Sequence, residues 1–139
     1  MAARTLSLYT LLLTIVLALG ACKKDDMATG TMDELTTLTD EIVTTVTGAA
    51  DKKAGVAEAQ KLLDAKKDEL APKMAEIMEL RGFQLSDEAQ AAVAKGMIDN
   101  AAKMDKLEID MLTETMRDEE LKAAVETLST DHENLIQGK

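Results

Sequence analysis

Apolar residues recur every three or four positions in four segments of the chain, the spacing that places them on one face of a helix. The segments cover residues 32–49, 56–81, about 86–115, and the stretch from 121 to about 136 that follows the charged run at 117–120. Each is long enough for at least four helical turns. The predicted stripes are Leu35, Leu38, Ile42 and Val46; Val56, Ala59, Leu63, Leu70, Met74 and Ile77; Val93, Met97, Ala101, Met104, Leu107 and Met111; and Leu121, Ala124, Val125, Leu128 and Leu135.

Residues that favour helix ends stand at the borders of these segments. Thr31 and Glu34 fit a capping box, and Ser86 is an N-cap candidate. Residues 48–55, with a glycine at each end, are a predicted turn, and Gly82 is placed to end the second segment.

Two features make the borders less regular. Pro72 lies inside the second segment, where it removes one backbone hydrogen bond and is expected to kink the helix near residues 68–70. The third and fourth segments could instead form one long helix over residues 86–136, because no Gly or Pro falls between Met97 and Ile136.

The pattern predicts an all-α fold, an antiparallel bundle of three or four helices with a long central helix hairpin over residues 56–115. Short connections make neighbours antiparallel, so the two shorter helices are expected to pack at the same end of this hairpin. Its other end would then have fewer covering partners. An exposed apolar tip indicates an interaction surface, so we expect a partner-binding site at Met78, Leu80, Phe83 and Leu85.

The first 21 residues have the organisation of an export signal. One positive charge, at Arg4, precedes an apolar run over residues 6–19. At about 1.5 Å per residue this run is shorter than the roughly 30 Å hydrocarbon core of a membrane. Residues 1–21 are therefore a predicted signal peptide, and the alternative is an uncleaved membrane anchor over residues 5–22.

The end of the signal peptide and the residue after it read Leu19-Gly20-Ala21-Cys22. This motif resembles the lipobox of bacterial lipoproteins, although Ala or Ser is commoner than Gly at the second position. The resemblance implies that the Cys22 thiol carries diacylglycerol, that cleavage occurs before Cys22, and that the new amine is acylated. Two or more acyl chains give stable anchoring. In the enteric sorting pattern an Asp after the Cys retains a lipoprotein in the inner membrane, so Lys23 favours the outer membrane, facing the periplasm.

These boundaries divide the chain into a signal peptide (1–21), a flexible tether (22–31) and a helical domain (32–139). The net charge of the whole chain is −10, and losing Arg4 with the signal makes it −11. Because nucleic-acid binding depends on Lys and Arg, so acidic a domain is not expected to bind nucleic acid.

Metal and cofactor sites find little support in the pattern. Met97, Met104 and Met111 could offer thioethers to Cu(I), but heptad spacing places them about 10.5 Å apart along a helix, so core filling is expected. His132 is the only histidine and is expected to be solvated near the C-terminus. A charged outer face explains Asp105, Glu108, Asp110 and Glu114 better than a calcium site does. No cofactor or metal is predicted.

No catalytic motif is present, and if Cys22 is acylated no thiol remains as a nucleophile. The sequence therefore predicts a non-catalytic, membrane-anchored lipoprotein that binds or scaffolds an unknown protein partner or associates with itself. Two alternatives stay open. One is an envelope structural protein that contacts peptidoglycan through the terminal Lys139, and the other is a metal or ligand carrier.

Overall fold

The structure, a computed structural model, describes residues 2–80 and 84–139, with side chains described for residues 24–80 and 84–139. All of the described elements are helices, which confirms the all-α prediction. They are α1 (Ala2–Gly48), α2 (Lys52–Glu79), α3 (Asp87–Asp110), the single turn α4 (Leu112–Thr115) and α5 (Glu119–Ile136).

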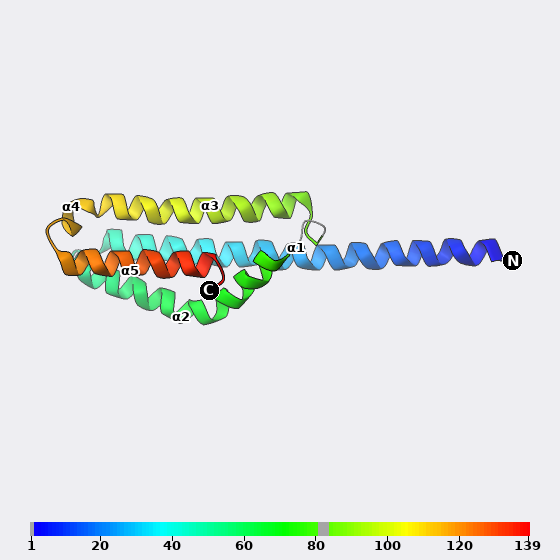
Figure 1. The fold of residues 1–139 in the computed structure, drawn as a ribbon, viewed down its shortest axis with the longest axis horizontal. Coiled ribbons are helices and arrows are strands. Elements are labelled where there is room, and N and C mark those ends of the chain that lie inside the picture. Colours follow the sequence, from blue (N-terminus) through cyan, green and yellow to red (C-terminus); the bar gives the residue numbers. More distant parts are fainter. Residues whose placement is uncertain (1, 81–83) are drawn as a thin grey trace.

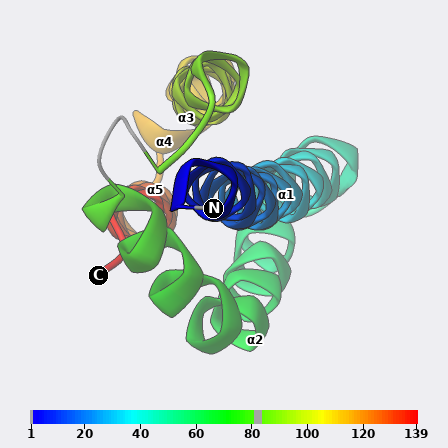
Figure 2. The same ribbon diagram turned by 90° about the vertical axis from the view of Figure 1, so that its right-hand side faces the viewer.

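Helices α1 and α3 run in one direction, and α2 and α5 run in the other (Figure 1). α1 packs along both α2 and α3, α2 also packs on α5, and α3 makes a smaller contact with α5. Viewed from the end, α1 lies beside both α2 and α3 (Figure 2). Among the described residues α2 and α3 do not contact each other, so the expected central hairpin is wrong. Instead, α2 buries its apolar stripe against α1 and α5, and α3 packs mainly on α1.

Residues 24–31 belong to α1, which differs from the flexible tether predicted for residues 22–31. Ala28 is fully buried, and Lys24 forms an ion pair with Glu76 of α2. Thr31 does not cap a helix, because its hydroxyl donates to the Met27 carbonyl oxygen, 2.8 Å away, inside the same helix. The apolar stripe continues from Leu35 back through Met32 to Ala28, and this burial outweighs the lower helix propensity of Gly30 and the threonines.

The turn between α1 and α2 is shorter than predicted, with α2 beginning at Lys52. The Lys52 ammonium group donates to three carbonyl oxygens at the end of α1, including that of Thr47 at 2.8 Å. Asp51 caps α2 by accepting from the Ala54 amide at 3.2 Å. A Cβ atom at Gly55 would lie 2.5 Å from the Cβ of Ala49 in the turn, so only glycine permits this close approach of α2 to the turn.

α2 contains Pro72 and bends along its length (Figure 1), and a kink in this helix is what Pro72 predicted. The chain end packs against this part of α2. Gly138 has a φ of +68°, and its amide and that of Lys139 donate to the carbonyl oxygens of Leu135 and Asn134. This is the Schellman arrangement, in which glycine is strongly favoured.

A break separates α3 from α5, so the alternative of one long helix over residues 86–136 is wrong. Asp118 is the N-cap of α5, and one of its carboxylate oxygens accepts from the amides of Glu120 and Leu121, both at 3.1 Å. Lys53 of α2 pairs with Asp118 and Glu120 and fixes the turn to α2. Hydrogen bonds that the Lys53 ammonium group donates to Glu120 and Asp118 raise the pKa of Lys53 to about 12.

Candidate functional site

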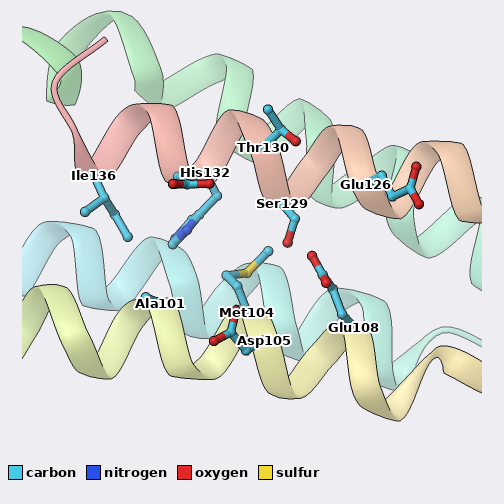
Figure 3. Close-up of a pocket in the computed structure, with 10 residues that line it drawn as sticks. Ala101, Met104, Asp105, Glu108, Glu126, Ser129, Thr130, His132 and Ile136 are labelled. Atoms are coloured by element: carbon cyan, nitrogen blue, oxygen red, sulfur yellow. The ribbon is translucent and has the colours of Figure 1, made fainter.

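A groove of about 400 Å³ lies between α3 and α5, the two adjacent helices that approach each other least closely. Figure 3 shows Met104 and Glu108 of α3, and Ser129, His132 and Ile136 of α5, pointing into the space between the two helices. The lining residues are Ala101, Met104, Asp105 and Glu108 from α3, and Glu126, Ser129, Thr130, His132, Glu133 and Ile136 from α5.

All charged side chains that line the groove are acidic: Asp105, Glu108, Glu126 and Glu133. Within the described part of the chain, none of these four carboxylates forms an ion pair with a lysine. Some acids elsewhere do: Lys73 binds Glu34 and Glu69, and Lys103 binds Asp40. The four carboxylates give the groove a negative charge that no lysine of the described residues compensates.

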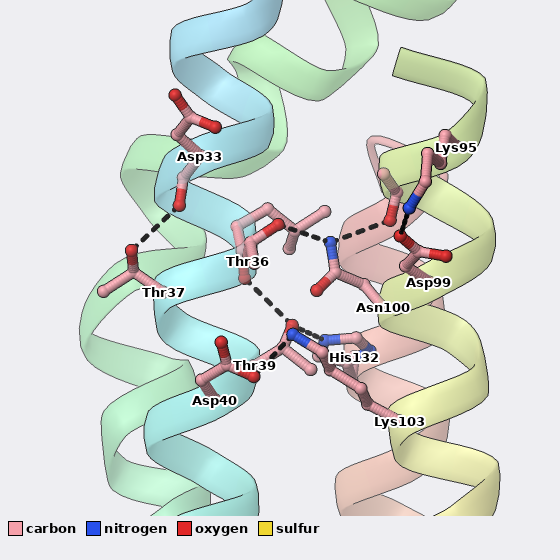
Figure 4. A network of polar contacts seen from close by, with 12 residues as sticks. Asp33, Thr36, Thr37, Thr39, Asp40, Lys95, Asp99, Asn100, Lys103 and His132 are labelled. Carbon is pink, nitrogen blue, oxygen red and sulfur yellow. Dashed lines mark hydrogen bonds and ion pairs between the residues drawn. The ribbon is translucent and has the colours of Figure 1, made fainter. Parts of the chain in front are cut away.

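His132 lies at the base of the groove, where only 1% of the residue is exposed. Its Nε2 lies 2.8 Å from the Thr39 hydroxyl oxygen of α1, on the other side of the bundle (Figure 4). Because the Thr39 hydroxyl donates to the Leu35 carbonyl oxygen at 2.9 Å, we assign Nε2–H as the donor to Thr39. The neutral ring then offers only an acceptor, Nδ1, to other groups.

Burial lowers the pKa of His132 to about 4, since removing the ring from water disfavours its charged form. The sequence-based expectation of a solvated histidine is wrong. The signal was present in the spacing, because Leu128, His132 and Leu135 continue the alternation of four and three that begins at Leu121 and Val125.

Asn100 is a second buried polar side chain in the core. Its amide group donates to the Thr36 hydroxyl oxygen at 3.0 Å and to the Gly96 carbonyl oxygen at 2.9 Å (Figure 4). Its Oδ1 makes no hydrogen bond in the structure. The predicted stripe of α3 placed Met97 and Ala101 in the core, but Met97 is half-buried and Ala101 is exposed at the groove.

Exposed apolar side chains follow the outer face of α3 and continue through α4. Ile98, Ile109, Leu112 and Met116 are 69%, 70%, 56% and 76% exposed. On a helix, residues three and four apart are neighbours, so Ile98, Ala101, Asp105, Ile109 and Leu112 share one face. Ala101 and Asp105 also line the groove, so the apolar face of α3 borders the acidic groove directly.

The predicted partner-binding residues are not part of this groove. Met78 is exposed at the end of α2, and Leu80 and Leu85 are half-buried. Phe83 and the side chain of Cys22 lie outside the described residues. The tip is less bare than expected, because residues 24–32 of α1 extend along it and Met74, Ile77 and Val93 are buried.

Among the side chains that the structure describes, no three His, Cys, Asp or Glu residues are grouped so that they could hold a metal ion. Met104 and Met111 lie in the core. For the same part of the chain, no helix has the length and apolarity of a membrane span. Comparison with protein families, with curated proteins and with solved structures finds no match to this chain.

Proposed function

We propose that the protein is a lipid-anchored, extracytoplasmic binding module that uses the groove between α3 and α5 to hold a basic segment of a partner protein. The lipobox at residues 19–22 supports the anchor, with Cys22 as the acylated residue and the outer membrane, facing the periplasm, as the location. In this proposal the domain binds and does not catalyse.

The observation that carries the binding role is the set of four carboxylates without a lysine partner in the described chain along one groove, beside an exposed apolar face. Opposite charge across an interface steers association and suppresses wrong partners. The exposed apolar residues Ile98, Ile109 and Leu112 supply binding affinity, because the burial of apolar area contributes most of the affinity of an interface. A segment that carries lysine or arginine on one face and leucine or isoleucine on the other fits both features, as in helix-in-groove recognition.

Binding can be tested with a synthetic amphipathic peptide of lysine and leucine, labelled for fluorescence anisotropy and titrated with the acylated protein in detergent. We expect the double variant Glu108→Gln, Glu126→Gln to bind at least tenfold more weakly than the wild type. Ile109→Ser should also weaken binding, because it removes apolar contact without changing charge.

The control is Glu41→Gln with Glu58→Gln, which changes the net charge by the same amount on α1 and α2. This variant should bind within about twofold of the wild type. If both double variants lose affinity equally, the peptide responds to overall charge, and the groove is not its site.

The anchor is tested separately on the protein in its native envelope. Mass spectrometry should find Cys22 at the N-terminus with diacylglycerol on sulfur and an acyl chain on the amine. The variant Cys22→Ser should leave the membrane fraction. An intact residue 1–21 segment, or an unmodified Cys22 thiol, would remove the basis for the proposed location.

A further inference from the structure

We propose that the end of the bundle at which α1 enters rests directly on the membrane surface, with Met78 and the half-buried Leu80 and Leu85 against lipid headgroups. This inference rests on the proposed acylation of Cys22. The occupant is a zwitterionic lipid interface, and no second protein is needed at this end.

The length of chain between anchor and bundle is the first argument. Lys24 is two residues after Cys22, and two residues span at most about 7 Å even when fully extended. Lys24 already belongs to the packed part of α1. The acyl chains would therefore hold this end of the bundle within about one helical turn of the lipid.

The contacts of the first described turns of α1 are the second argument. Lys24 pairs with Glu76 of α2, and the Asp25 carboxylate accepts from the Ser86 amide at 2.9 Å, just before α3. Four residues after Lys24, Ala28 is fully buried. Because the start of α1 is fixed to two other helices, the domain cannot swing away from the membrane as it would on a flexible tether.

The surface chemistry of this end is the third argument. Met78 is 55% exposed on the penultimate residue of α2, and the ends of α2 and α3 and the entry of α1 lie together (Figure 1). Thioether and leucine side chains are tolerated in the interfacial region. The neighbouring acids Glu79, Asp87 and Glu88 would be repelled by an anionic leaflet, so the favoured surface is zwitterionic.

The amino-acid composition allows the membrane contact to be tested by tryptophan fluorescence. The chain has no tryptophan, and its one tyrosine, Tyr9, lies in the predicted signal peptide. A single tryptophan introduced into the acylated protein therefore reports on its own position. We choose Met78→Trp for the membrane end and Met116→Trp as the matched control, because both replace an exposed methionine and the second lies at the opposite end of the bundle.

Both acylated variants are reconstituted in vesicles of phosphatidylethanolamine and phosphatidylcholine that contain lipids with a nitroxide near the headgroup. We expect quenching of Trp at position 78 to be at least threefold stronger than at position 116, with a blue-shifted emission at position 78 only. Adding an anionic lipid should reduce the difference. The pair Glu79→Trp and Thr113→Trp repeats the comparison at neighbouring exposed positions and guards against a misfolded first pair.

Equal quenching at the two ends, in protein that floats with the vesicles and carries acyl chains by mass spectrometry, would overturn the membrane contact while leaving the lipid anchor intact. Protein that neither carries acyl chains nor floats would overturn the anchor and this inference together.

Discussion

One buried imidazole ring, that of His132, makes the stability of this bundle depend on pH. The pKa of His132 falls to about 4 through burial, whereas an exposed histidine titrates near 6.5. Between these two values the unfolded chain binds more protons than the folded one does. The contribution of His132 to stability is therefore fully present above about pH 6.5 and is lost as the pH falls toward 4.

Replacing His132 with leucine should remove this dependence. The Thr39 hydroxyl still donates to the Leu35 carbonyl oxygen, so no buried donor is left without a partner. Relative to the wild type, the variant should gain roughly 2–3 kcal/mol in free energy of unfolding between pH 7 and pH 4.5. Urea denaturation followed by circular dichroism at both pH values measures this difference, from which the common titration of the carboxylates cancels. A difference that does not change with pH would show that burial does not control the ring.

Replacement by alanine is expected to have opposite effects on stability at Gly138 and at Gly30. At Gly138 the φ of +68° is unfavourable for alanine, and a Cβ would lie 2.5 Å from the Ala75 backbone nitrogen. At Gly30, inside α1, a Cβ would meet nothing within 4 Å. Gly138→Ala should destabilise the protein by about 1–2 kcal/mol, and Gly30→Ala should stabilise it by about 0.5–1 kcal/mol.

Thermal unfolding of the two variants beside the wild type gives the signs directly. A neutral Gly138→Ala variant would mean that the chain end does not pack against α2. A destabilised Gly30→Ala variant would mean that residue 30 is not helical in solution.

At the scale of elements, α1 is the helix against which both α2 and α3 pack. It contacts α2 and α3 along its length, and its residues 24–31 add the buried Ala28 and the links to Glu76 and Ser86. A chain of residues 32–139 should therefore be less stable than one of residues 24–139 by about 2 kcal/mol, mainly through lost apolar burial. Chemical denaturation of the two chains measures the difference. Equal stability of the two chains would indicate that residues 24–31 act as a tether.

The sequence predicted the helices better than it predicted their neighbours. Residues such as Ser86 and the acids near Asp118 mark helix starts by chemistry that acts over three residues, so these borders could be read locally. The start of the packed part of α1 could not, because Thr31 and Gly30 are typical of a helix border and only distant contacts keep them helical. The contact of α1 with both α2 and α3 depends on spatial order, which period and loop length leave open.

The groove between α3 and α5 could not be predicted either, because it also depends on the spatial order of the helices. Asp105 and Glu108 are exposed, as expected for a charged face of α3, but they line the groove, and nothing in the sequence places Glu126 and Glu133 opposite them. The four acids share one groove because α3 and α5 are widely spaced. His132 was within reach of sequence analysis, since it occupies an apolar position of the α5 heptads; its place near the C-terminus misled the prediction.

At the scale of the whole molecule, the net charge of −10 works against compactness. The ion pairs between helices, such as Lys73 with Glu34, are at the surface, where each contributes little. Raising NaCl from 20 to 500 mM should therefore increase the Tm, because screening weakens the general repulsion more than it weakens these pairs. Thermal scans at several salt concentrations test this, and a Tm that falls with salt would assign a larger share of the stability to the ion pairs.

The order of contacts makes the molecule two helical pairs, α1 with α2 and α3 with α5. The second pair packs more extensively on the first, through α1 with α3 and α2 with α5, than its own two helices pack on each other. The only covalent link between them is the connection between Glu79 and Asp87. Nothing in the packing requires that both pairs come from the same chain. At high protein concentration we therefore expect two molecules to exchange their second pairs and form a domain-swapped dimer, which size-exclusion chromatography over a concentration series would detect.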